Sequence, residues 1–153
     1  MPVTRADVVR EARSWIGTPH MHQQMRKHEG CDCIGLIRGV YRALGLTMCP
    51  TKVEAAAGRF NTGYARVPDG VTFKAYCDHF MVHVAQAEMQ PGDVIIMRYD
   101  KDPQHAAILA DYRHGGLSMI HAMQSPRRRV AEHRLDPTWR RRIVAAYSIP
   151  GVE

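Results

Sequence analysis

The chain has 153 residues, of which 45% are hydrophobic and 24% charged, the composition of a single globular domain with a core of its own. No stretch approaches the roughly 18 apolar residues of a membrane-spanning helix, and residues 1–13 lack the apolar core of a secretory leader. We therefore expect one domain over residues 1–153. It would be made in the cytoplasm and would need another delivery route for any action outside the cell.

The formal net charge of +6 is concentrated near the C-terminus. Residues 127–142 hold seven arginines against Glu132 and Asp136, which leaves +5 in this stretch. Such a patch suits an anionic partner such as nucleic acid, cell wall or an acidic protein surface, and it is equally typical of a solvated edge strand. Trp139 is its only aromatic neighbour, so the stacking platform of a single-strand binder is weak and no nucleic-acid partner is expected.

The first expected element is a helix near the N-terminus. Thr4 to Asp7 has the spacing of a capping box. The apolar face that follows ends at Gly17 and consists of Val8, Ala12, Trp15 and Ile16. Residues 17–30 show no clear period and predict a loop, which contains His20, His22 and His28.

A second helix is expected from Cys33, because Asp32 is a good N-cap and Gly45 is a good helix stop. Its apolar face has helical spacing and consists of Ile37, Val40, Tyr41 and Leu44. Cys33 would lie in the first turn, where unpaired backbone N–H groups and the helix dipole favour a thiolate. The negative charge of Asp32 acts in the opposite direction. Cys33 is thus a candidate nucleophile.

The remaining elements predict an α+β fold. Residues 46–70 favour a loop with a short helix at 52–57, and residues 73–84 favour an amphipathic helix. The apolar side chains of that helix would be Phe73, Tyr76, Cys77, Phe80, Met81 and Val84. Turns then separate five expected strands, at 94–97, 105–109, 117–122, 129–135 and 143–149. We expect the N-terminal helices to pack on a C-terminal antiparallel sheet of about five strands.

The cysteines and two strand histidines suggest nucleophilic chemistry. Since no C-x-x-C pair occurs, the cysteines are expected to be reduced, with Cys49 and Cys77 as small buried hydrophobes. A nucleophilic cysteine needs a nearby base and a third group that orients the base. His105 opens the second expected strand and His121 lies near the end of the third, and neighbouring antiparallel strands can bring such positions together.

Six segments stand in an order known from one family, at residues 12–19, 30–40, 91–94, 105–108, 120–122 and 139–142. Together they resemble the NlpC-type cell-wall peptidases, which are papain-like cysteine enzymes, and especially the branch found in phage tails and gene transfer agents. The resemblance covers nearly the whole chain. Its most specific parts are the Asp-Cys-x-Gly-Leu helix start at 32–36 and the two later histidines.

The resemblance implies a Cys-His-His triad. Cys33 matches the nucleophile, His105 the base that takes its proton, and His121 the residue that orients the base. The backbone N–H of Cys33 would help to hold the tetrahedral oxyanion. Substrate contacts are expected at His20, Asp32 and Gly35. Enzymes of this type cleave amide bonds in peptidoglycan stem peptides, commonly between γ-linked D-glutamate and a diamino acid, and the resemblance implies no metal or other cofactor.

The resemblance also implies a delivery route. The peptidase would travel as part of a phage-type tail, with other tail proteins as partners, and would act on the host cell wall. The basic C-terminal stretch would help to keep it near anionic wall polymer, which predicts binding that weakens with salt.

Three positions depart from the family pattern. His20 stands where the family usually has Tyr, Ile34 where many members have Ser, and Ala107 where many have Gly. These changes leave the triad intact and concern substrate contacts. His20 could donate a hydrogen bond as Tyr would, although it is smaller and titrates near neutrality, or it could be a solvated loop residue.

Other function classes stay open. A structural tail-tip protein of the same fold would need no turnover, and nucleic-acid binding through the arginines would depend steeply on salt. A zinc site is a third alternative, because thiolate and imidazole ligands occur close together at His20, His22, His28, Cys31 and Cys33. The Cys-x-Cys and His-x-His spacings are poor for structural zinc.

Overall fold

The structure is a computed structural model that describes residues 1–46, 74, 77–79, 81–99 and 103–153. Helix α1 (Arg5–Ser14) begins at the expected capping box, in which Thr4 and Asp7 bond reciprocally. Val8, Ala12 and Trp15 are buried as expected. The expectation for Ile16 is wrong: it is 43% exposed, because the helix ends at Ser14, and Val9 is buried instead.

Helix α2 (Cys33–Ala43) carries the candidate nucleophile and packs against α1. Its N-cap is Asp32, and the chain leaves it through Gly45, whose φ of +69° lies in the left-handed region that favours glycine. The two helices approach closely at Gly39, where a Cβ atom would lie 2.2 Å from the ring of Trp15.

The segment before α2 holds more structure than the plain loop that was expected. Strands β1 (Met25–Arg26) and β2 (Gly30–Cys31) form a small antiparallel pair there. Two-residue strands show no alternation of apolar and polar residues, so the sequence pattern had no period to reveal.

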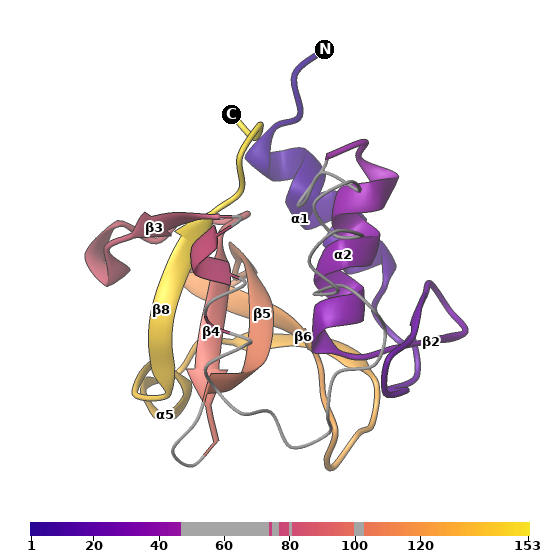
Figure 1. The fold of residues 1–153 in the computed structure, drawn as a ribbon. Helices are drawn as coiled ribbons and strands as arrows, with labels where there is room; N and C mark the ends of the chain where they lie inside the picture. Colours follow the sequence, from indigo (N-terminus) through magenta and orange to yellow (C-terminus); the bar gives the residue numbers. More distant parts are fainter. Residues whose placement is uncertain (47–73, 75–76, 80, 100–102) are drawn as a thin grey trace.

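Beyond α2, most of the described residues belong to a six-stranded sheet and its connections (Figure 1). Its neighbours run in the order β3-β8-β4-β5-β6-β7, all paired antiparallel. The strands are β3 (Val82–Val84), β4 (Val94–Arg98), β5 (Pro103–Asp111), β6 (Leu117–Ala122), β7 (Val130–Arg134) and β8 (Ile143–Ser148). The 3-10 helix η1 (Gln86–Glu88) follows β3, and the short helix α5 (Pro137–Arg140) joins β7 to β8. The five expected strands are confirmed, and β3 is a sixth.

Strand β3 corrects the expectation of a helix through residue 84. Residues 74 and 77–79 are helical and Cys77 and Met81 are buried, but Val82–Val84 pairs with β8. Val-His-Val also satisfies the alternation of a strand, and pairing with the sheet decides between the two periods. Phe73, Tyr76, Phe80, Cys49 and the expected helix at 52–57 lie outside the described residues.

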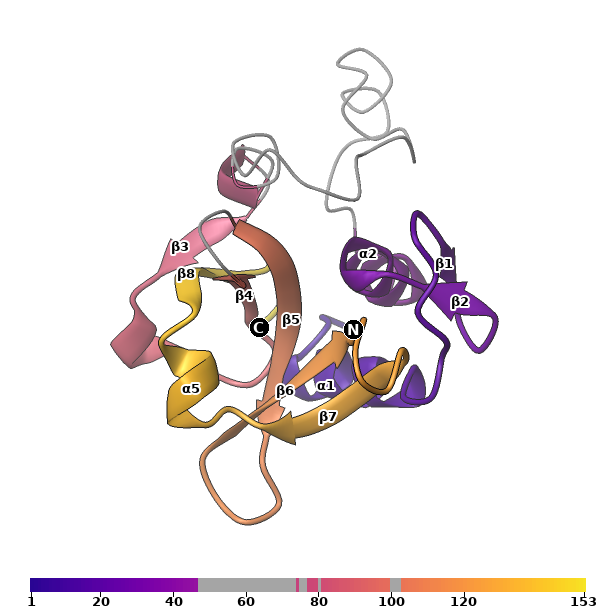
Figure 2. The same ribbon diagram turned by 90° about the horizontal axis from the view of Figure 1, so that it is seen from below.

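The sheet is buried on both faces. Helices α1 and α2 lie on one side of it and α5 on the other (Figures 1 and 2). Alternate strand residues join the first core with α1 and α2, among them Ile96, Ile108 and Ile120. Their neighbours on the strands form a second core with Leu135 and Trp139, among them Ile95, Leu109 and Met119. No described helix is long and apolar enough to cross a membrane.

Candidate active site

The position of Cys33 is set by Asp32 and the loop before it. One carboxylate oxygen of Asp32 accepts a hydrogen bond from the N–H of Gly35 and the other from the N–H of Gln23, each at 2.8 Å. Gly35 lies directly under this loop, since a Cβ atom there would be 1.9 Å from the carbonyl oxygen of Gln24. Asp32 and Gly35 therefore hold the loop against the first turn of α2.

Cys33 is half-buried in the first turn of α2, and its thiol is protonated at rest. Burial, and then the neighbouring Asp32 carboxylate, raise the pKa of Cys33 to about 12. Backbone hydrogen bonds from Ala106, Ile34 and Cys33 itself lower this pKa, as the helix-start argument expects, but burial outweighs them. The contact with the backbone of Ala106 places the thiol beside β5, the strand that also carries His105.

The other two described cysteines are also free thiols, as expected, and both are buried. Burial raises the pKa of Cys31 to about 12 and also raises the pKa of Cys77. Deep burial makes both of them inert side chains of the core.

Three strands bring three histidines into one hydrogen-bonded row, called here the histidine network. Nε2 of His105 lies 2.7 Å from Nδ1 of His121, and Nε2 of His121 lies 2.7 Å from Nε2 of His133. Nδ1 of His133 lies 2.9 Å from the carbonyl oxygen of Arg134. The register of β5, β6 and β7 makes each histidine a diagonal neighbour of the next on one face of the sheet.

His133 is a member of this network that the sequence did not single out. Its strand was expected at 129–135, but the sequence pattern does not show which residues of that strand pair with the strand at 117–122. A histidine inside an expected strand was the available signal, and it becomes informative only once the register places it near His121.

Aromatic rings enclose the histidine network. The ring centroid of Trp139 lies 5.2 Å from that of His121, 5.4 Å from that of His133 and 6.4 Å from that of His105. Tyr99 lies 5.1 Å from His105 on the same measure. Burial, with smaller contributions from neighbouring histidines, lowers the pKa of His105 to about 3 and that of His121 to about 2. Both rings are therefore neutral at rest.

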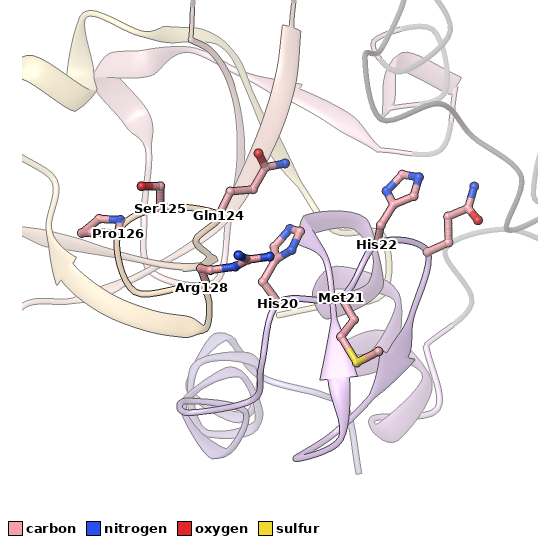
Figure 3. Close-up of a pocket in the computed structure, with 8 residues that line it drawn as sticks. His20, Met21, His22, Gln124, Ser125, Pro126 and Arg128 are labelled. Carbon is pink, nitrogen blue, oxygen red and sulfur yellow. The ribbon is translucent and has the colours of Figure 1, made fainter.

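A pocket of about 790 Å³ lies between the segment after Pro19 and the β6–β7 connection (Figure 3). Its lining residues are His20, Met21, His22, Gln23, Gln124, Ser125, Pro126 and Arg128. The two segments are joined by a hydrogen bond of 2.7 Å from the N–H of His20 to the carbonyl oxygen of Arg128. Burial is the main cause that lowers the pKa of His20, and His22 and Arg128 act in the same direction. His20 also contributes to the lowered pKa of His105.

The zinc alternative gains no support from the described part of the chain. Among those residues no group of three or more His, Cys, Asp or Glu side chains is arranged to hold a metal ion. The ring nitrogens of the histidine network face one another at hydrogen-bond distance, which is too short for a metal ion between them.

A cysteine at the start of a helix, packed on an antiparallel sheet whose strands carry hydrogen-bonded histidines, defines the class of papain-like cysteine peptidases. The sequence agrees with this class, since the model of the NlpC/P60 family matches residues 17–148. The chain belongs to the NlpC/P60 family. The phage-tail branch within it stays a prediction.

Solved structures of family members share the fold at low sequence identity. An NlpC/P60 family protein from Bacillus cereus is 20% identical with a TM-score of 0.65, and the match covers 95% of this chain and 40% of that protein. The NlpC/p60 domain of the peptidoglycan hydrolase SagA is 22% identical with a TM-score of 0.64, covering 96% of this chain and all of that domain. A lipoprotein-like member from Staphylococcus aureus is 19% identical with a TM-score of 0.60, covering 97% of this chain and 43% of that protein. No curated protein matches the chain.

Proposed function

We propose that this protein is a cysteine peptidase that hydrolyses amide bonds in peptidoglycan stem peptides, with Cys33 as nucleophile, His105 as base and His121 as the residue that orients the base. The observation that carries the proposal is the 2.7 Å contact between His105 and His121, together with the contact of Cys33 with Ala106. The first contact pairs the proposed base with the residue that orients it, and the second puts the proposed nucleophile against the strand that carries the base.

The proposed reaction begins with a neutral thiol and a neutral imidazole. Because the pKa of Cys33 is raised and that of His105 is lowered, proton transfer accompanies attack of the sulfur on the substrate carbonyl. The proton moves to Nδ1 of His105, since Nε2 is bonded to His121. The backbone N–H of Cys33 stabilises the oxyanion, His105 returns the proton to the leaving amine, and water then hydrolyses the thioester.

The pocket between the segment after Pro19 and the β6–β7 connection is the proposed binding site for the stem peptide. Its side chains include His20 and Arg128, which provide hydrogen-bond donors and positive charge for a carboxylate (Figure 3). The α-carboxylate of a γ-linked D-glutamate would be such a group, so the proposed scissile bond is that between γ-D-glutamate and a diamino acid. His20 occupies the place of the usual family Tyr.

We propose further that the protein is a component of a phage-type tail, where other tail proteins are its partners and the host cell wall is its site of action. This part is supported by the resemblance to the phage-tail branch. A catalytically silent tail-tip protein of the same fold is the competing function. Mass spectrometry of purified tail particles would detect the protein, and its absence from them would contradict the tail role.

The decisive experiment on the enzyme is digestion of purified peptidoglycan and soluble muropeptides, read by mass spectrometry. Wild type is compared with Cys33→Ala, and each is run with and without chelator. We expect wild type alone to release stem-peptide fragments, and chelator to have no effect. Cys31→Ala is the matched control, because it removes a thiol two residues away and should retain activity. Absence of products from wild type would favour the silent tail-tip protein.

A further inference from the structure

The outer end of the histidine network has no role in the reaction just described. His133 is half-buried on β7 and contacts His121 through Nε2 and the carbonyl oxygen of Arg134 through Nδ1. The same carbonyl oxygen accepts a hydrogen bond of 3.0 Å from the N–H of Asp136. A carbonyl oxygen can only accept, so its part in the network is settled before any histidine is considered.

The tautomer of each ring follows from this fixed end. Nδ1 of His133 must carry a proton to donate to Arg134, so a neutral His133 has a lone pair at Nε2. His121 must then donate from Nε2, which leaves a lone pair at its Nδ1. His105 must donate from Nε2 to that lone pair. The last free position of the network is therefore Nδ1 of His105, and it is an acceptor.

We propose that His133 is a positioning residue of the peptidase: with the Arg134 carbonyl it sets the tautomers of His121 and His105, so that Nδ1 of His105 can accept the proton of the Cys33 thiol. This inference rests on the proposed function, because it takes His105 as the base. Two residues on neighbouring strands, His121 and His133, then determine the tautomer of His105, whereas the proposed reaction names His121 alone.

The opposite direction of donation would disable the base. If His121 donated from Nδ1, then His105 would accept at Nε2 and carry its proton on Nδ1, where it could not take one from a thiol. That arrangement requires His133 either to carry protons on both nitrogens or to give up its bond to Arg134. When His105 becomes charged in the reaction, by contrast, its Nε2–H still donates to His121, so no hydrogen bond of the network has to reverse.

The packing around the network supports neutral rings with a single direction of donation. Trp139 contacts all three imidazoles, and His105 and His121 are 3% and 0% exposed. Burial lowers the pKa of both rings, which keeps each of them at one proton. Water has little access to offer a buried ring an alternative hydrogen bond, so His133 is the partner that decides the tautomer of His121.

The tautomers can be read directly, without any assay of activity. We would label the protein with ¹⁵N-histidine and record long-range ¹H–¹⁵N correlation spectra at about pH 8, where an ordinary histidine is neutral. Single His→Gln variants assign the signals. We expect His105 and His121 to be protonated at Nε2 and His133 at Nδ1. A His133 protonated at Nε2, or a His105 protonated at Nδ1, would overturn the inference.

Two variants then connect the tautomer with catalysis. His133→Phe keeps an aromatic ring beside Trp139 but has no acceptor, whereas His133→Gln places an oxygen near the position of Nε2. We expect His133→Phe to lower kcat about 10- to 100-fold with little change in KM, and His133→Gln to recover most of that loss. His114→Phe, in the exposed β5–β6 turn, is the control and should match wild type. A purely structural role would instead impair both His133 variants alike and leave the tautomer of His105 unchanged.

The outcomes separate this inference from the proposed function. If wild type cleaves stem peptides and His133→Phe has the same kcat, the inference fails and the peptidase stands. If wild type releases no product, the proposed function fails, and the spectra alone decide whether His133 orders the network.

Discussion

Two regions of the molecule hold the candidate active site, and they do so with different kinds of contact. Around Cys33 the ordering hydrogen bonds of Asp32 reach Gly35 and Gln23, partners only three and nine residues away. In the histidine network the bonds join residues 16 and 12 positions apart, on separate strands. The thiol is therefore placed by a local structure that one short segment can encode. The base exists only once the sheet has formed.

The two regions also differ in the charge that their surroundings favour. Burial raises the pKa of Cys33 and lowers that of His105, so both surroundings favour the neutral form, although one group is an acid and the other a base. The Asp32 carboxylate adds to this effect at the thiol. The surroundings of both groups therefore oppose a thiolate–imidazolium pair in the resting site, which is why the proposed reaction starts from neutral groups.

The largest expected effect comes from removing the base in the strand region. His105→Gln should lower kcat/KM on a stem-peptide substrate about 10³- to 10⁴-fold, because nothing then takes the proton of the thiol. The two regions act as a unit, so the double variant with Cys33→Ala should be no worse than Cys33→Ala alone. Losses that multiply would show that the thiol and the imidazole act independently.

The segment around Cys33 can be destabilised at Gly35, which takes no part in the proposed proton transfer or bond cleavage. Gly35→Ala should reduce the free energy of unfolding by about 3 kcal/mol, because its Cβ atom would lie 1.9 Å from the carbonyl oxygen of Gln24. Helix propensity alone predicts the opposite, an increase in the free energy of unfolding of up to about 1 kcal/mol, because Ala favours a helix more than Gly does. The sign of the change, measured by urea unfolding, therefore distinguishes the steric effect from the propensity effect. The reverse exchange at an exposed site of the same helix, Ala43→Gly, should cost only about 1 kcal/mol.

Acid should weaken the strand region through its buried histidines. Below about pH 6.5 histidines of the unfolded chain take up protons, while His105 and His121 stay neutral in the folded state because burial lowers their pKa values to about 3 and about 2. The contribution of these two histidines to the free energy of unfolding is therefore complete above about pH 6.5. It decreases as the pH falls toward 3, by about 1 kcal/mol per pH unit for each histidine. Unfolding by urea between pH 6.5 and 5 measures the slope, and His121→Gln should flatten it. An equal slope in that variant would contradict the assignment.

The smallest expected effect concerns the charge next to the thiol. Asp32→Asn keeps an oxygen that can cap Gly35 but removes the negative charge, so the pKa of Cys33 should fall while staying above its usual value, because burial remains. The pH dependence of thiol alkylation measures the shift. Glu29→Gln removes an exposed charge from the same loop and serves as the control. An unchanged or raised pKa in Asp32→Asn would show that the carboxylate does not act on the thiol.

Much of the fold was predictable because its signals are local. The capping box at Thr4, the N-cap at Asp32 and the stop at Gly45 concern hydrogen bonds and backbone angles within a few residues. The strand at 94–97 was visible because it is apolar over its whole length, and the strand at 117–122 because four of its six residues are apolar and turns bound it. The same local signals placed Cys33 in the first turn of its helix, where the structure has it.

What tertiary structure alone decided is the pairing and burial of those elements. Val82–Val84 fits a helix or a strand by pattern, and its partner β8, more than sixty residues later, makes it a strand. His133 gains a meaning only from the register of β6 and β7, and the neutral states of Cys33 and His105 follow from burial by distant segments. Periodicity and caps act between neighbours in sequence, whereas strand register, desolvation and the direction of a hydrogen-bonded network depend on residues that only the folded chain brings together.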